Sequence, residues 1–144
     1  MSAPIIRVSR RINAPAERVF DAWLDPAMIG RFMFGLHLRD EQVVSLTNEP
    51  RVGGTFHYRV TRSGTEIDHT GTYRVIERPS QLVFTWGVNE EQGDLSVVTI
   101  EITPHGDACE LTLTHALHPD WAEYAERTQA GWTKIVGDLA DTLA

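Results

Sequence analysis

The sequence has little cysteine, no excess of positive charge and no long apolar run. Cys109 is the one cysteine among 144 residues, which excludes an intrachain disulfide and fits a reducing compartment. The 13 Lys and Arg residues against 20 Asp and Glu give a formal net charge of -7, whereas nucleic acid and anionic membrane surfaces need a basic partner. No apolar stretch approaches the roughly 20 residues of a membrane span, and the first residues lack the apolar region of a secretory signal. We therefore expect a cytoplasmic protein with no nucleic-acid or membrane partner.

The sequence also lacks a pattern for metal binding or nucleophilic catalysis. Its six histidines are scattered: His57 and His69 fall on neighbouring strand-like segments, where they could lie near each other, and His115 and His118 straddle a strand end. A zinc site normally recruits three or four ligands, and no compact set is visible. Cys109 begins an alternating strand and is interpreted as a small buried hydrophobe, because no elbow motif accompanies it. We expect no metal, no cofactor and no catalytic signature.

What is present is typical of one globular domain spanning residues 1–144, with 42% hydrophobic and 23% charged residues. Period-two alternation predicts a first strand over residues 5–12. Pro15 suits the first position of a helix, and an apolar face at helical spacing follows it. Asp25 is placed to cap a second short helix that contains Phe32.

Five strand-like runs with period two follow between Gly53 and Ala116. Ser63 and Gly64 indicate a hairpin turn after the first run, and the other connections are also short, so neighbouring strands should pair antiparallel. The predicted strands cover residues 54–61, 71–77, 82–86, 96–103 and 109–117.

A long final helix is predicted from about residue 121 to residue 144. Asp120 and Glu123 resemble a capping box at its start. One apolar stripe runs along it through Trp121, Ala125, Thr128, Trp132, Ile135, Leu139 and Leu143. Gly131 costs roughly 1 kcal/mol relative to alanine inside a helix, which suggests that a side chain there would occupy useful space.

The order of strand, two short helices, a run of strands and a long terminal helix predicts an α+β helix-grip fold, a curved antiparallel sheet wrapped around that helix. One helix leaves part of the concave side of such a sheet unfilled, which indicates an apolar cavity for a small molecule. His115 and Tyr58 continue apolar faces, so we expect both to point inward, where they would either orient a ligand or bond to backbone or water. The predicted ligand-binding residues are Phe32, Tyr58, Phe84, Trp86, Ile100, His115, Thr128, Trp132 and Val136. The tryptophans among them are more typical of a core than of a binding site, but in this fold the core on the concave side is also the wall of the cavity.

Several segments also resemble a known family, the START-like or SRPBCC superfamily. The chain is most similar to its branch of activator of heat-shock-protein-ninety ATPase homologues, of the bacterial single-domain type. The segments that carry the resemblance are residues 12–23, 52–56, 71–76, 82–86 and 131–132, and they are structural rather than catalytic motifs. Members of the superfamily bind lipids, hormones or polyketides, and some act as cyclases or dehydratases. The eukaryotic chaperone activators carry an additional N-terminal domain, for which we expect no counterpart here.

Three functions stay open on these grounds. The first is binding of a small apolar or amphipathic molecule in the cavity. The second is an enzyme of cyclase or dehydratase type that uses the same cavity, with His115 and a tyrosine as acid–base groups. The third is a protein-interaction module related to chaperone activators. The possible partners are accordingly a small molecule, a chaperone or a second copy of the chain in a homodimer.

Overall fold

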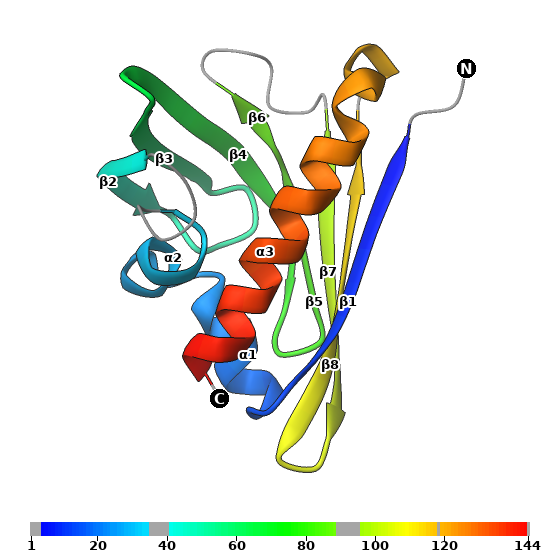
Figure 1. Cartoon of the computed structure of the whole chain (residues 1–144). Helices are drawn as coiled ribbons and strands as arrows, with labels where there is room; N and C mark the ends of the chain where they lie inside the picture. Colours follow the sequence, from blue (N-terminus) through cyan, green and yellow to red (C-terminus); the bar gives the residue numbers. More distant parts are fainter. Residues whose placement is uncertain (1–3, 35–40, 89–95, 118, 144) are drawn as a thin grey trace.

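The computed structural model describes residues 4–34, 41–88, 96–117 and 119–143 of the chain. It confirms the predicted α+β helix-grip fold: a curved antiparallel sheet holds one long helix, α3, across its concave side (Figure 1). The elements in chain order are β1 (Ile5–Ile12), α1 (Ala16–Ala22), α2 (Pro26–Phe32), β2 (Glu41–Asn48), β3 (Thr55–Arg62), β4 (Thr65–Glu77), β5 (Gln81–Thr85), β6 (Gly87–Val88), β7 (Val97–His105), β8 (Ala108–Ala116), the 3-10 helix η1 (Pro119–Tyr124) and α3 (Ala125–Leu143).

The sheet has the strand order β1-β8-β7-β5-β4-β3-β2, and β6 pairs with β4 beside this path. All of these pairs are antiparallel, which confirms the prediction that short connections allowed for the consecutive strands from β3 to β8. The first strand lies beside the last, so that Ile6 is opposite His115 and Ile12 is opposite Cys109. The two edges of the sheet are therefore β1 and β2.

The predicted hairpin turn after β3 is confirmed and is tighter than expected. Ser63 and Gly64 both have positive φ, 50° and 83°, and Arg62 pairs directly with Thr65. Such a two-residue turn matches the twist of the strands that it joins. Strand β4 therefore starts immediately after the turn, six positions before Gly71, where the sequence predicted it.

One strand was not predicted, and the starts of two helices were predicted at the wrong residue. The strand β2 was not predicted, and it carries a register irregularity between Val43 and Ser45. Pro15 occupies the N-cap position of α1 instead of the first helical position. The α-helix α3 begins at Ala125, after the 3-10 helix, instead of near residue 121. The predicted cap of α2 is confirmed, because the side chain of Asp25 accepts a hydrogen bond from the backbone N–H of Ala27 at 3.0 Å.

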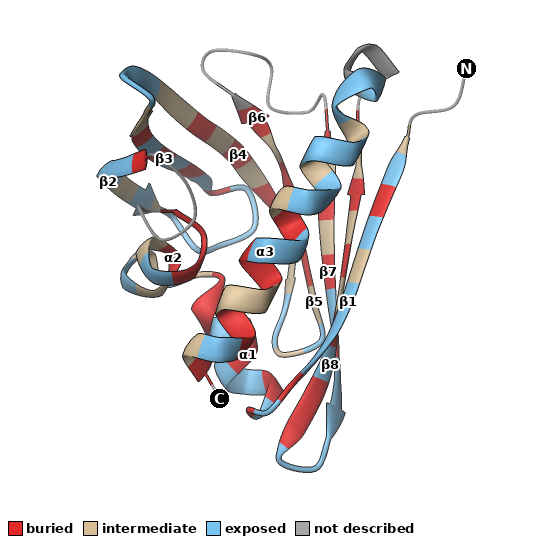
Figure 2. Cartoon of the chain, viewed as in Figure 1, coloured by how far each residue is buried: buried red, intermediate tan, exposed pale blue. Residues whose placement is uncertain are grey.

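The hydrophobic core fills the space between α3 and the concave side of the sheet (Figure 2). From α3 it receives the second half of the predicted apolar stripe, Trp132, Ile135, Leu139 and Leu143, together with Val136 and Ala140. Ala125 and Thr128 of the same stripe are half-buried, and the side chain of Trp121 lies outside the described residues. Opposite them the sheet contributes a chain of neighbouring rings, in which Phe56 stacks on Tyr58 with centroids 4.6 Å apart. Phe84 meets the edge of Phe56 at 5.6 Å. These aromatic side chains occupy much of the volume that one helix leaves uncovered.

Candidate functional site

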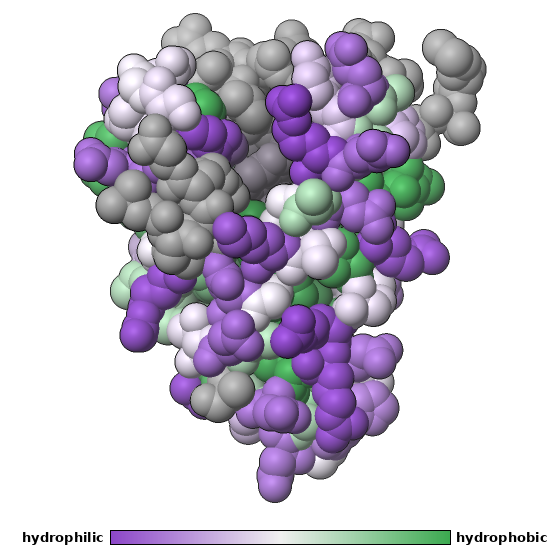
Figure 3. Space-filling model, in the orientation of Figure 1, coloured by the Kyte–Doolittle hydropathy of each residue, from purple (hydrophilic) through white to green (hydrophobic). Residues whose placement is uncertain are grey.

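An open cleft of about 370 Å³ lies between the first half of α3, the residues that follow α2, and strands β3 and β4. Most of its walls are apolar or aromatic, and two arginines and one histidine stand among them. On the outward side of α3 the space-filling view shows mainly hydrophilic residues, with apolar ones between the helix and the sheet (Figure 3). The lining residues are Met33, Phe34, Arg62, His69, Trp86, Arg127, Thr128, Gly131, Trp132 and Ile135.

Deeper inside, the described residues enclose a void of about 10 Å³ rather than a large cavity. This is about the space of a single water molecule. Its walls are the side chains of Trp23, Met33, Phe56, Tyr58, Tyr73, Phe84 and Trp86. We expected this part of the interior to be unfilled, but aromatic rings pack it. The cleft beside it is much larger than the void.

His115 forms the centre of a buried hydrogen-bond chain behind the cleft. Its Nδ1 accepts a hydrogen bond from Nε1 of Trp132 at 3.0 Å. Because Nδ1 is an acceptor, the neutral ring carries its proton on Nε2, which donates to Oγ of Ser96 at 3.0 Å. Ser96 in turn donates to the backbone carbonyl of Trp86 at 2.6 Å. These hydrogen bonds thus connect the two tryptophans of the cleft, Trp132 on α3 and Trp86 just after β5.

Burial lowers the pKa of His115 to about 4, because the protonated ring would lose its hydration without gaining a charged partner. The side chain of His115 is 1% exposed. The hydrogen-bond chain also requires the neutral ring, because Nδ1 accepts the hydrogen bond from Trp132 and so carries no proton. Both ring nitrogens are used inside the protein. The sequence-based expectation that His115 points inward is confirmed, and its hydrogen bonds go to protein groups.

A second buried network contains Tyr58. Its hydroxyl lies 3.2 Å from the hydroxyl of Tyr73, which also accepts a hydrogen bond from Nδ2 of Asn48 at 3.1 Å. The same amide nitrogen donates to the backbone carbonyl of Leu24 at 2.8 Å. Burial raises the pKa of both tyrosines, so both hydroxyls stay protonated at neutral pH. Tyr58 is inward-facing as predicted, and its hydroxyl bonds to another side chain of the core.

A third network places charge at the cleft. Oε2 of the buried Glu41 accepts hydrogen bonds from both Nε and Nη2 of Arg62, the first at 2.8 Å. Nη2 of Arg62 also lies 3.2 Å from Nε2 of His69. In this hydrogen bond Arg62 is the donor, because a guanidinium has no acceptor. Arg62 is therefore held in one orientation from two sides. Sequence reasoning missed this network, because Glu41 begins the strand that was not predicted.

The predicted ligand-binding residues fall into three groups. Trp86, Thr128 and Trp132 line the cleft. Tyr58 and Phe84 border the small void, as does Trp86. The remaining ones lie in the packed core or behind the cleft wall: Phe32, Ile100, Val136 and His115. The cleft residues that the sequence did not single out as ligand-binding are Met33, Phe34, Arg62, His69, Arg127, Gly131 and Ile135.

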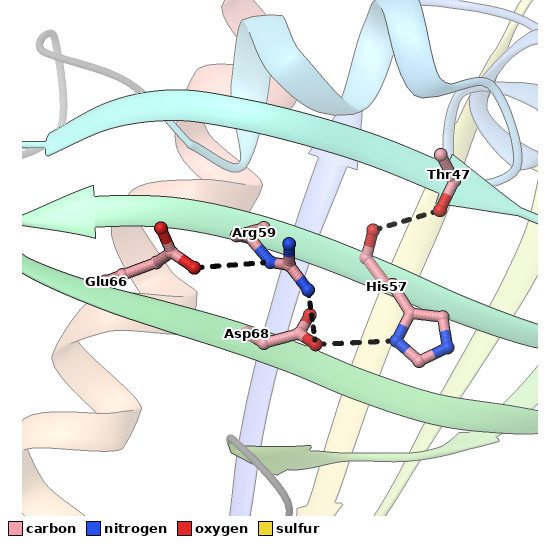
Figure 4. A network of polar contacts seen from close by, with 5 residues as sticks. All are labelled: Thr47, His57, Arg59, Glu66 and Asp68. Carbon is pink, nitrogen blue, oxygen red and sulfur yellow. Dashed lines mark hydrogen bonds and ion pairs between the residues drawn. The ribbon is translucent and has the colours of Figure 1, made fainter.

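The polar residues on the outer side of β3 and β4 form a surface network (Figure 4). Asp68 lies 3.5 Å from Nδ1 of His57 and 3.7 Å from Nη2 of Arg59, which also contacts Glu66. His57 is exposed on this side, whereas His69 is buried, so the two side chains lie on opposite sides of the sheet although their strands are neighbours. Across residues 4–34, 41–88, 96–117 and 119–143, no three His, Cys, Asp or Glu side chains gather in a way that could hold a metal ion. In the same ranges no helix is long and apolar enough to cross a membrane.

Solved structures with the same fold come from several bacteria. The chain is similar to protein CV1439 from Chromobacterium violaceum, with a TM-score of 0.84, 23% sequence identity and 96% of each chain covered. It is also similar to CalU16 from Micromonospora echinospora, with a TM-score of 0.72 and 22% identity over 99% of this chain and 77% of that one. No curated protein has a significantly similar sequence.

A solution structure from Aeromonas hydrophila, described as an AHSA1-like protein, matches with a TM-score of 0.73 and 22% identity. The alignment covers 94% of this chain and 90% of that one. At these identities the likeness concerns the fold. The sequence itself matches the family model described as "Activator of Hsp90 ATPase homolog 1-like protein" over residues 13–144. Because this match covers most of the chain, the protein belongs to the family of Activator of Hsp90 ATPase homolog 1-like proteins.

Proposed function

We propose that this protein binds a small amphipathic molecule in the cleft, with the apolar part of the molecule against Trp86 and Trp132. The cleft volume of about 370 Å³ lies within the range of roughly 300–1,000 Å³ that is usual for small-molecule sites. Its composition, rings and aliphatic side chains with a few polar groups, is also usual for such sites. Because the cleft is open at its outer side, a bound molecule would keep one end in contact with water.

The observation that carries the proposal is the space beside Gly131. Among the residues that the structure describes, a Cβ atom added at Gly131 would meet no heavy atom within 4 Å apart from its chain neighbours and the local helix backbone, although Gly131 lies between Ala130 and the buried Trp132. A glycine inside a helix costs roughly 1 kcal/mol relative to alanine, and no clash with a described residue requires it here. The helix thus loses some stability to keep this space empty, and this favours the interpretation that a ligand occupies it.

The proposal is tested by filling the cleft from the helix. Gly131→Leu places an aliphatic side chain in the open space, whereas Gly137→Leu makes the same change in α3 outside the cleft. Among the described residues, a Cβ at Gly137 would meet only the end of the Arg10 side chain, at 3.6 Å. Both variants should fold, because each gains helix propensity.

The measurement is the fluorescence of the uncharged dye N-phenyl-1-naphthylamine, titrated with each protein. We expect the wild type and Gly137→Leu to bind the dye with similar affinity, and Gly131→Leu to weaken binding by roughly tenfold or more. Equal binding by all three proteins would place the dye elsewhere and refute the proposal. So would a lack of binding to the wild type.

The geometry favours binding over the acid–base alternative. A cyclase or dehydratase of the type considered from the sequence would need His115 and a tyrosine in contact with its substrate. His115 uses both ring nitrogens within the protein, and Tyr58 bonds to Tyr73. The protein-interaction alternative predicts a complex with a chaperone that Gly131→Leu leaves intact, so the same variant separates it from ligand binding.

A further inference from the structure

We infer that the ligand of this cleft is an aromatic monoanion, whose acidic group is bound by Arg62 and Arg127. This inference rests on the proposed function, since it describes what the same cleft accepts. It follows from the charges of the cleft, from the fixed orientation of Arg62 and from the shape of the aromatic wall.

The charge of the cleft is opposite to that of the whole protein. The chain carries a formal net charge of -7, yet the cleft is lined by two arginines and by no described aspartate or glutamate. The guanidinium carbon of the exposed Arg127 lies 6.0 Å from the centroid of the Tyr124 ring. Within the described ranges it makes no ion pair. A cationic group at the mouth of a low-dielectric cleft attracts anions from solution.

Arg62 is arranged in advance to receive a third hydrogen-bond acceptor. Glu41 and His69 hold its Nε and Nη2, and its Nη1 has no hydrogen-bond partner in the part of the chain that the structure describes. A guanidinium carries five N–H donors in a rigid fork, so Nη1 still offers donors to a carboxylate or sulfonate. Glu41, Arg62 and Arg127 together carry one positive charge, because the carboxylate of Glu41 neutralises one of the two arginines. That charge matches a group with a single negative charge.

The wall of the cleft favours a flat ligand. Phe34, His69 and Trp86 form a continuous stack, with centroids 5.2 Å and 5.1 Å apart and interplanar angles of 32° and 23°. Trp132 adds a second wall, tilted by 60° to Trp86 at 5.4 Å. Aromatic rings pack against such walls in offset or edge-on contacts. An aromatic acid satisfies both the rings and the arginines.

Two dyes with the same ring system separate the acidic group from the apolar body. The dye 8-anilino-1-naphthalenesulfonate carries one sulfonate, and N-phenyl-1-naphthylamine is the same molecule without it. We would titrate both dyes with the wild type, with Arg127→Gln and with Arg74→Gln. Arg74 is exposed on the opposite side of the sheet and gives the same change in net charge.

We expect Arg127→Gln to raise the dissociation constant of the sulfonate dye about fivefold and to leave that of the uncharged dye within about twofold. Arg74→Gln should leave both constants unchanged. Added salt should weaken binding of the sulfonate dye only.

An equal effect of Arg127→Gln on both dyes, or on neither, would overturn the inference. If the wild type binds the uncharged dye and Gly131→Leu blocks it, while the sulfonate dye does not bind, the anion inference fails and the proposed function stands. If neither dye binds the wild type, both fail.

Discussion

Acid should destabilise this protein through His115. In the folded protein the ring is buried and neutral, and burial lowers its pKa to about 4 from the usual 6.5. In the unfolded chain the ring regains its usual pKa. Between these two values the unfolded chain therefore binds more protons than the folded protein, and the free energy of unfolding rises with pH. The contribution of His115 is fully present above pH 6.5 and is lost as the pH falls to about 4.

The size of the effect follows from the two pKa values. Each pH unit between them changes the free energy of unfolding by about 1.4 kcal/mol, so the whole interval corresponds to about 3 kcal/mol. The described groups that bond to the ring or lie opposite it carry no charge. Its two nitrogens bond to Trp132 and Ser96, and the residues opposite it on the neighbouring strands are Ile6 and Val98.

The assay is urea unfolding followed by tryptophan fluorescence, at several values between about pH 7 and pH 4, for the wild type and His115→Gln. Glutamine has an acceptor and a donor but does not titrate. Carboxylates such as Asp21, whose pKa the hydrogen bond from Arg78 lowers, also lose stabilisation in acid, but they do so equally in both proteins. The advantage of the wild type over the variant should therefore shrink by about 3 kcal/mol across this range. If it stays constant, His115 does not titrate as its burial requires, and the reasoning is refuted.

Three further substitutions test the networks that shape the site, each by urea unfolding at neutral pH. Trp132→Phe leaves Nδ1 of His115 buried without its donor and should cost about 1–3 kcal/mol; an unchanged midpoint would contradict the hydrogen bond. Gly71→Ala should cost roughly 1–3 kcal/mol or more, because its Cβ would approach the backbone oxygen of Thr85 to 2.0 Å; a stable variant would show that the strands can move apart. Glu41→Gln removes the charged partner of Arg62 and should lower the free energy of unfolding by about 2 kcal/mol. An unchanged free energy of unfolding would show that water solvates the pair.

The fold could be predicted because most of its strands are half-buried. Alternation over residues 54–61 and 109–117 gives the side that faces the core, and the short turns give antiparallel pairing. Strand β2 has no such pattern, because the exposed Val43 and Val44 are consecutive and a register irregularity lies between Val43 and Ser45. The start of α3 was misplaced because a 3-10 helix and an α-helix share much the same sequence preferences.

The site was harder to predict, because its contacts join residues that are distant in the sequence. One signal was nevertheless present. A two-residue turn at Ser63 and Gly64 fixes the register of its hairpin, and this register places His69 opposite Tyr58 on the inward side. Alternation had already placed Tyr58 inward. The sequence thus contained the position of His69, but no pattern in it relates Glu41 to Arg62, or His115 to Trp132.

Trp132 belongs to both the core and the cleft, and this decides which residue can test ligand binding. Its indole N–H bonds to His115, while its ring lines the cleft together with Trp86. Any truncation of Trp132 therefore removes a cleft wall, a buried hydrogen bond and core packing at once, and a large loss of stability would not distinguish a binding residue from a core residue. Gly131 has no such double role, because adding a side chain there removes no contact within the protein. Substitution of Gly131 should therefore change the affinity for an added ligand, whereas substitution of Trp132 should change the free energy of unfolding. A cleft that lies beside a packed core requires these two effects to be separate.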